Sequence, residues 1–112
     1  ADVVVDCTDN FATRYLLHEV CKQAGKPLVF GAIEGFEGLL TVFTADSHFT
    51  LQELFDSTNR TPSKAVMGVT PAVLGSLQAS EILKIIGNYG EPLCNKLLSV
   101  NLLTNQFNLI DL

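Results

Sequence analysis

The sequence predicts an α/β fold with a mixed parallel and antiparallel sheet, and three observations carry this prediction. A strand signal, a helix signal and a second strand signal open the chain, which is the order of a right-handed parallel crossover. Two further strand signals close the chain and are joined by a short polar turn, as in an antiparallel hairpin. The glycine-rich strand–turn–helix that cradles phosphates in nucleotide-binding folds is absent from these residues. We therefore expect the later half of a Rossmann-like three-layer nucleotide-binding fold.

The opening crossover is predicted from its residue types. Val3–Asp6 is rich in β-branched residues, as are strands buried inside a parallel sheet. Phe11–Ala24 reads as a helix because Gly25 follows it at a position that favours glycine. Pro27–Ile33 is the second buried strand. The helix is preceded by three residues that favour N-cap positions, Thr8, Asp9 and Asn10.

The predicted first helix has two faces of different character. Its apolar face carries Leu16, Leu17, Val20, Cys21 and Ala24. Its polar stripe carries Arg14, His18 and Lys22 at four-residue spacing. On this pattern we expect the apolar face to meet the core.

The second half of the chain continues the sheet. Leu39–Phe43 is a third strand, and the polar residues 45–69 form a long crossover loop. A helix then starts with Thr70 as N-cap and runs from Pro71 to Gly87. It is apolar around most of its circumference, which predicts a central, covered helix, and Gly75 inside it suggests close packing against a neighbour. The hairpin strands are Leu97–Leu102 and Phe107–Leu112, joined by a tight turn centred on Thr104 and Asn105.

Composition narrows the possible partners. The chain has 112 residues, 7 basic and 12 acidic side chains and a net charge of −5, so a nucleic-acid interface is not expected. Polar residues interrupt the longest apolar stretch, so we also expect no membrane span. An apolar content of 47% is high for a small domain and suggests that some surface is covered by further sequence or another subunit. The three cysteines are widely spaced, which fits a reducing cytoplasm and neither a disulfide framework nor a zinc site.

The best candidate for chemistry follows the first strand. Asp9 and Asn10 are expected at the carboxyl edge of the sheet, where ligands gather in open α/β folds, and at a helix N-terminus, which favours anions. The Asp9 carboxylate could hold Mg²⁺ bound to nucleotide phosphates, and Asn10 could bond sugar or phosphate. Arg14 lies one turn further on and could point back to this edge. From local chemistry alone, an ordinary N-cap role for Asp9 and Asn10 is the simpler explanation of the pattern.

Four segments together resemble one family in order and spacing. They are DVVVDCTDNFATRYLL, GKPLVFGAIEGFEGLLTVF, GVTPAVLGSLQASEILKIIGNYGEPL and KLLSVNLLTNQFNLIDL. They are similar to the later half of the ThiF/MoeB/HesA adenylyltransferases, the bacterial relatives of ubiquitin-activating enzymes. The resemblance implies that residues 1–112 are the C-terminal part of a single ThiF-type adenylation domain, whose N-terminal Gly-rich nucleotide-binding half is not in this chain.

The resemblance also implies an activity for the parent protein. Members of the family use ATP and Mg²⁺ to adenylate the C-terminal Gly-Gly carboxylate of a ubiquitin-like sulfur-carrier protein, for thiamine or molybdopterin biosynthesis. It gives Asp9 the role of the Mg²⁺–ATP carboxylate, puts Asn10 in the nucleotide site, and matches Arg14 to the trailing arginine of the motif, with a more structural role. It further implies a homodimer in the intact enzyme.

The departures from the family pattern matter as well. The zinc-binding C-x-x-C pairs found in many members are missing, so no zinc is expected, and the loop from Ala45 to Val69 contains no cysteine nucleophile. We expect the 112 residues alone to be inactive, because half of the nucleotide site is missing. Two alternatives remain open at this point. One is a non-catalytic module for dimerisation or for binding a ubiquitin-like protein, and the other is half of an unrelated dinucleotide-binding domain.

Overall fold

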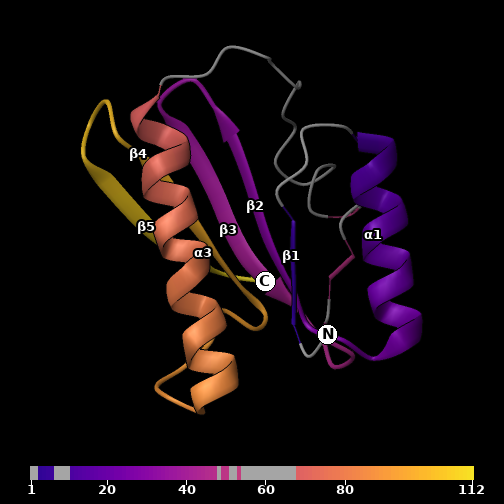
Figure 1. Ribbon diagram of the computed structural model, residues 1–112. Helices are drawn as coiled ribbons and strands as arrows, with labels where there is room; N and C mark the ends of the chain where they lie inside the picture. The colour runs from indigo at the N-terminus through magenta and orange to yellow at the C-terminus, as the bar shows by residue number, and fades with distance from the viewer. Residues whose placement is uncertain (1–2, 7–10, 48, 51–52, 54–67) are drawn as a thin grey trace.

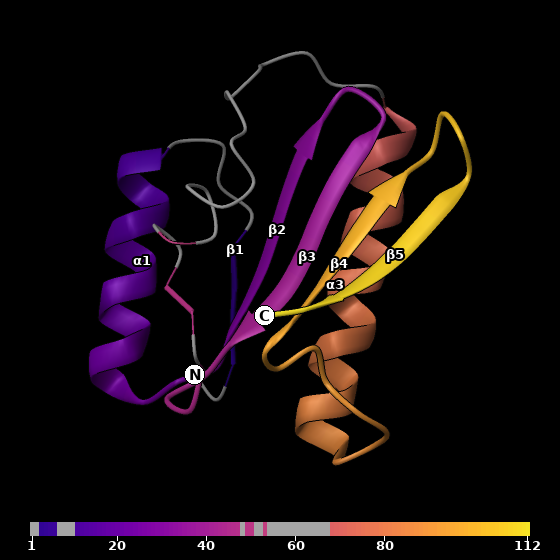
Figure 2. The ribbon, with the colours of Figure 1, turned by 180° about the vertical axis from the view of Figure 1, so that it is seen from behind.

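The computed structural model describes residues 3–6, 11–47, 49, 50, 53 and 68–112. Within them, a five-stranded sheet separates two helices, so the described residues form three layers (Figure 1). Helix α3 crosses one face of the sheet, and helix α1 lies beside the first strand at the other side of the molecule. The view from behind shows the same arrangement (Figure 2). The α/β fold expected from the sequence is thereby confirmed.

The observed elements follow the predicted order with small shifts at their ends. Helix α1 spans Phe11–Ala24, as predicted, and Gly25 follows it with a positive φ of 68°. Helix α3 spans Val69–Gly87. The strands are β1 (Val4–Asp6), β2 (Leu28–Glu34), β3 (Glu37–Phe43), β4 (Lys96–Asn101) and β5 (Gln106–Asp111).

The strands lie in the sheet in sequence order, and only the first pair is parallel. Strands β1 and β2 pair in parallel through α1, and β2–β3, β3–β4 and β4–β5 are antiparallel. The β2–β3 turn is tight, because Glu34 pairs with Glu37 and Gly35 has a φ of 58°. Asn105, with a φ of 59°, lies in the β4–β5 turn where the sequence predicted it. The mixed sheet is thus a parallel edge followed by an antiparallel meander.

The core fills both faces of the sheet because side chains alternate along each strand. Cys21 of α1 packs with Leu28 and Phe30 of β2 on one face. Val29 points to the other face, where Leu74 of α3 belongs to the same cluster. This alternation places β2 inside the molecule with apolar contacts on both sides, as expected for a strand covered on both faces of the sheet.

Helix α3 begins earlier than predicted. Its N-cap is Gly68, and Thr70 is not a cap. The hydroxyl of the fully buried Thr70 instead donates a hydrogen bond of 2.7 Å to the carbonyl of Gly35 in the β2–β3 turn. The predicted loop 45–69 therefore ends at Gly68. Of the predicted loop, the structure describes residues 45–47, 49, 50, 53 and 68, and the others lie outside the described residues.

The prediction that α3 is covered all round is wrong for this chain. One face packs on the sheet, but Leu83 is 63% exposed and Ile86 is 66% exposed. A Cβ added at Gly75 would meet nothing within 4 Å, so the close neighbour expected there is not among the described residues. By length and composition alone α3 is long and apolar enough to cross a membrane, and core helices of folded proteins pass the same test. The buried residues of α3 lie against the sheet.

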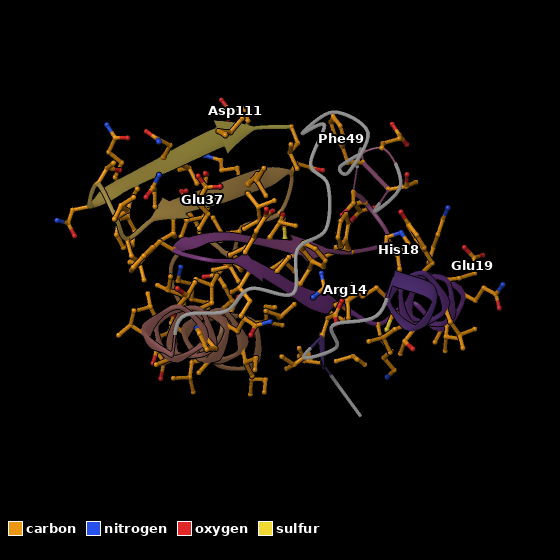
Figure 3. All side chains as sticks on the ribbon, turned by 90° about the horizontal axis from the view of Figure 1, so that it is seen from above. Arg14, His18, Glu19, Glu37, Phe49 and Asp111 are labelled. Carbon is orange, nitrogen blue, oxygen red and sulfur yellow. The ribbon has the colours of Figure 1, made fainter. Side chains whose placement is uncertain are left out.

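The two faces of α1 are also partly reversed. Leu16 is 65% exposed and Val20 is 53% exposed, although both belong to the predicted apolar face. Arg14 and His18 from the polar stripe turn toward the strands, while Glu19 points away (Figure 3). The hydrophobic periodicity alone therefore did not identify the inward face of this helix.

Candidate functional site

The candidate site is the carboxyl end of the parallel β1–β2 pair. Strand β1 ends at Asp6 and α1 starts at Phe11, so the connection between them begins at the edge where ligands bind in open α/β sheets. The predicted site residues Asp9 and Asn10 belong to this connection and lie outside the described residues. The described part of the edge is formed by Asp6, Arg14, Phe30 and the residues that contact them.

Asp6 is buried at the end of β1, with 1% of its surface exposed. It pairs in register with Phe30, so both side chains lie on the α1 face of the sheet. Burial raises the pKa of the Cys21 thiol, and the Asp6 carboxylate raises it further. Cys21 is therefore a protonated core residue at neutral pH and not a nucleophile.

Arg14 reaches the same place from the first turn of α1. Its side chain is 9% exposed, and its guanidinium lies 5.5 Å from the centre of the Phe30 ring. This is a cation–π distance, and burial makes such a contact stronger than at the surface. The geometry brings Arg14 to the Asp6 end of β1, as a packed residue of the core. Whether it contacts nucleotide stays a prediction.

A third contributor to this edge was not singled out in the sequence. Gln78 of α3 is buried at 8% exposure, and its Nε2 donates a hydrogen bond of 3.0 Å to the main-chain carbonyl of Asp6. Gly31 of β2 lies directly beneath this carboxamide. Sequence reasoning passed over Gln78 because a polar residue on a helix is usually exposed; its position on the α3 face that bears Leu74 was the only available signal.

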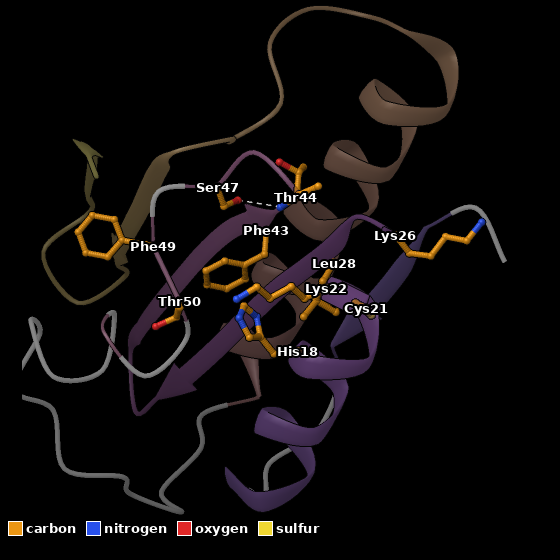
Figure 4. Close-up of a pocket in the computed structure, with 11 residues that line it drawn as sticks. His18, Cys21, Lys22, Lys26, Leu28, Phe43, Thr44, Ser47, Phe49 and Thr50 are labelled. Carbon is orange, nitrogen blue, oxygen red and sulfur yellow. Dashed lines mark hydrogen bonds between the residues drawn. The ribbon is translucent and has the colours of Figure 1, made fainter. Parts of the chain in front are cut away.

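A separate cavity of about 50 Å³ lies between the second half of α1 and the chain after β3 (Figure 4). It is far smaller than a nucleotide pocket, which occupies several hundred Å³. Its walls include His18, whose ring meets Phe43 edge to face at 4.7 Å. The Nδ1 of His18 is buried and has no hydrogen-bond partner among the residues that the structure describes. Burial, and then Lys22, lower the pKa of His18, while Glu19 opposes them. The lining residues are His18, Cys21, Lys22, Lys26, Leu28, Phe43, Thr44, Ala45, Ser47, Phe49 and Thr50.

The described side chains do not form a metal site. Among residues 3–6, 11–47, 49, 50, 53 and 68–112, no three His, Cys, Asp or Glu side chains are grouped so that they could hold a metal ion. The two described cysteines, Cys21 and Cys94, are both free, and burial raises the pKa of each. Asp9, the predicted contact for Mg²⁺, is not among these residues.

Comparison with known proteins settles the family. The model of the ThiF family matches residues 1–112. The chain belongs to the ThiF family. This membership removes the interpretation of an unrelated dinucleotide-binding half-domain.

Curated relatives of this ThiF-family chain are longer proteins. The sulfur carrier protein adenylyltransferase of Thermus thermophilus is 42% identical over 120 residues, which cover 95% of this chain and 43% of that protein. The SAMP-activating enzyme E1 of Haloferax volcanii is 43% identical and covers 88% of the chain and 38% of its own length. The adenylyltransferase and sulfurtransferase MOCS3-1 of Zea mays is 38% identical, over 99% of this chain and 25% of its own length. The chain thus spans between about a quarter and two fifths of these relatives.

Solved structures confirm the fold of the ThiF-family chain. Escherichia coli MccB, determined with ATP, superposes with a TM-score of 0.77 over 99% of this chain and 36% of its own, at 17% identity. MccB has also been solved with the nucleotide analogue AMPCPP and the peptide MccA, with the same TM-score. At this identity the likeness establishes the shared architecture and leaves the chemistry of this chain to be argued from its own residues.

Proposed function

We propose that this chain is the C-terminal part of an ATP-dependent adenylyltransferase that activates the C-terminal carboxylate of a ubiquitin-like sulfur-carrier protein. The observation that carries the proposal is an Asp-Cys-Thr-Asp-Asn run that begins at the carboxyl end of the parallel β1–β2 pair in a ThiF-family chain. Relatives named for the activation of sulfur carriers and of SAMP, and a neighbour solved with ATP, support it. We place the protein in the cytoplasm.

The proposed reaction joins two anions. One carboxylate oxygen of the carrier attacks the α-phosphorus of ATP, the bond from that phosphorus to the bridging oxygen breaks, and pyrophosphate leaves with the bonding electrons. The product is an acyl-adenylate, which is open to attack by a sulfur donor. The protein has to offset the negative charge that gathers around the α-phosphate, which is the task of electrostatic stabilisation. Mg²⁺ enters as part of the substrate, the Mg·ATP complex.

Within this chain, Asp9 is the residue we assign to Mg·ATP. A carboxylate oxygen is a hard ligand suited to Mg²⁺, and Asp9 follows β1 at the edge where phosphates bind at helix N-termini. Asn10 is assigned to the nucleotide by hydrogen bonding. Arg14 packs on Phe30, and we assign it a structural role at this edge and no part in the reaction. The partner residues that complete the nucleotide site are expected in sequence before Ala1.

The partners follow from the same proposal. The carrier protein supplies a carboxylate, and a second copy of the enzyme supplies an interface for a homodimer. Exposed apolar residues on α1 and α3, Leu16, Val20, Leu83 and Ile86, offer surface that further sequence or a second copy would cover. A second candidate function is a non-catalytic module for dimerisation or for binding a ubiquitin-like protein. The same exposed apolar residues favour it, and it needs no nucleotide.

Exchange of labelled pyrophosphate into ATP in the presence of a carrier protein tests the proposal. Two proteins are compared, the 112-residue chain and the full-length protein that contains it. The proposal predicts exchange by the full-length protein and none by the 112 residues. Full-length protein that binds carrier but never exchanges pyrophosphate supports the non-catalytic module instead.

A further inference from the structure

We propose that Gln78 is a positioning residue for the nucleotide site, because its side chain fixes the carboxyl end of β1 just before Asp9. The inference rests on the proposed function in one respect: it takes the residues after β1 to contact Mg·ATP. Three residues from three elements make this contact, namely Gln78 on α3, Asp6 on β1 and Gly31 on β2. Gln78 touches no reacting atom and acts through the backbone.

The hydrogen bond joins distant parts of the chain at one point. Nε2 of Gln78 donates to the carbonyl of Asp6 at 3.0 Å, across 72 positions of sequence. The N–H of Val4 donates to the carbonyl of Pro27, so the backbone polar groups of Val4 face β2. Alternate residues of a strand bond to the same side, so the N–H and C=O of Asp6 face β2 as well. The carbonyl of Asp6 thus faces β2 at the last paired position of β1, and Gln78 adds a side-chain donor at that position.

Gly31 makes this contact possible. A Cβ at position 31 would lie 2.6 Å from Nε2 and 2.8 Å from Cδ of Gln78, which is far closer than such atoms approach. The missing side chain of β2 thus leaves the space that the carboxamide fills. The absence of a side chain at Gly31 thus lets the Gln78 carboxamide reach the carbonyl of Asp6.

The location of this bond distinguishes Gln78 from the other residues that hold α3 to the sheet. Helix α3 is already held to the sheet by Leu74, by Thr70 on Gly35, and by Glu81 on the N–H of Leu93. These three contacts reach β3, the β2–β3 turn and the segment that leads into β4. Gln78 alone among these four reaches β1, three residues before Asp9. Small displacements of a site residue lower its effect on bound phosphates, so holding this point matters for nucleotide binding.

The test uses the full-length protein and the variant Gln78→Met, which keeps the length of the side chain and removes its donor. The matched control is Thr70→Val, which removes another buried side-chain bond from the same helix to a carbonyl of the β2–β3 turn. We expect Gln78→Met to raise the KM for Mg·ATP in pyrophosphate exchange by up to about tenfold, the limit set by the free energy of one buried hydrogen bond. We expect kcat to change less than KM, and Thr70→Val to leave KM unchanged.

A second variant keeps the test decisive if Gln78→Met folds poorly. Gly31→Ala displaces the carboxamide without removing it and should raise the same KM. The double variant should be no worse than the more affected single variant, since both changes remove one contact. In the 112-residue chain, hydrogen exchange of the β1 amides, residues 4–6, should become faster in Gln78→Met and stay unchanged in Thr70→Val.

The outcomes separate the two proposals. Unmodified full-length protein without exchange activity overturns the proposed function, and with it the role of Gln78. An active protein whose KM for Mg·ATP is the same in Gln78→Met, Gly31→Ala and the unmodified form overturns the positioning role alone. Equal KM increases in Gln78→Met and Thr70→Val overturn it too, because they would report general loosening of α3.

Discussion

Glu81 accepts a hydrogen bond of 2.7 Å from the backbone N–H of Leu93 while its other carboxylate oxygen pairs with Lys84 at 2.6 Å. Glu81 is 1% exposed, so the carboxylate is buried against the segment that leads from α3 into β4. Leu93 in turn bonds through its carbonyl to Val42 of β3. One buried acid thus ties the end of α3 to the middle of the sheet.

Replacing Glu81 by Met should lower the free energy of unfolding by about 1–3 kcal/mol, since the buried N–H of Leu93 loses its acceptor. Glu81→Gln should cost less, because the amide oxygen still accepts that bond. Lys84→Met should cost about 1 kcal/mol or less, because the lysine is partly exposed. Urea unfolding of the 112-residue chain measures all three. Equal costs for the Gln and Met variants would contradict the role given to the N–H of Leu93.

Two glycines should respond in opposite ways to alanine. A Cβ at Gly38 would overlap the side chain of Leu74 in the core between β3 and α3, so Gly38→Ala should destabilise the chain by about 1–3 kcal/mol. A Cβ at Gly75 would meet open space within a helix, so Gly75→Ala should stabilise the isolated chain by about 0.5–1 kcal/mol. Thermal unfolding of the two variants side by side provides the measurement. A loss of stability in Gly75→Ala of the isolated chain would contradict the open space found beside Gly75.

His18 should make stability depend on pH. Its pKa is lowered in the folded chain, so below about 6.5 the unfolded chain binds more protons and folding stability falls as the pH drops toward the folded pKa. For a single proton the slope stays below about 1.4 kcal/mol per pH unit. Urea midpoints between pH 7.5 and 5.5 should fall more steeply in the unmodified chain than in His18→Phe. Parallel slopes for the two proteins would rule out His18 as the titrating group.

Exposed apolar residues on the two helices should tolerate polar replacements in the isolated chain. Leu16→Gln and Leu83→Gln should change the free energy of unfolding by about 0.5 kcal/mol or less. Leu97→Gln, in the core between α1 and the sheet, should cost several times more and serves as the control. Urea unfolding measures these costs. A large loss at Leu16 or Leu83 in the 112-residue chain would mean that these side chains are already packed.

Local residue types predicted most of the fold. The β-branched strands, the glycine after α1 and the Asn105 turn placed the elements within a few residues, since each rests on short-range sterics or capping. The inward face of α1 could not be predicted in the same way. Arg14 and His18 face the strands because Phe30 and Phe43 offer aromatic surfaces to them, and those contacts exist only after the sheet has formed.

The candidate site was predicted in part. The motif pointed to Asp9, Asn10 and Arg14, and the structure brings Arg14 to the end of β1, while Asp9 and Asn10 lie outside the described residues. Gln78 and Gly31 could not be connected from sequence, because their contact depends on how α3 crosses β2 far along the chain.

Pyrophosphate exchange by the Asp9→Asn variant of the full-length protein tests the central claim most directly. The amide cannot replace the charged oxygen that we assign to Mg·ATP, whereas Asp46→Asn, an exposed acid after β3, is the matched control. We predict that Asp9→Asn lowers the exchange rate roughly 100-fold or more and that Asp46→Asn leaves it unchanged. Exchange at the unmodified rate and with the unmodified Mg²⁺ dependence in Asp9→Asn would contradict the account.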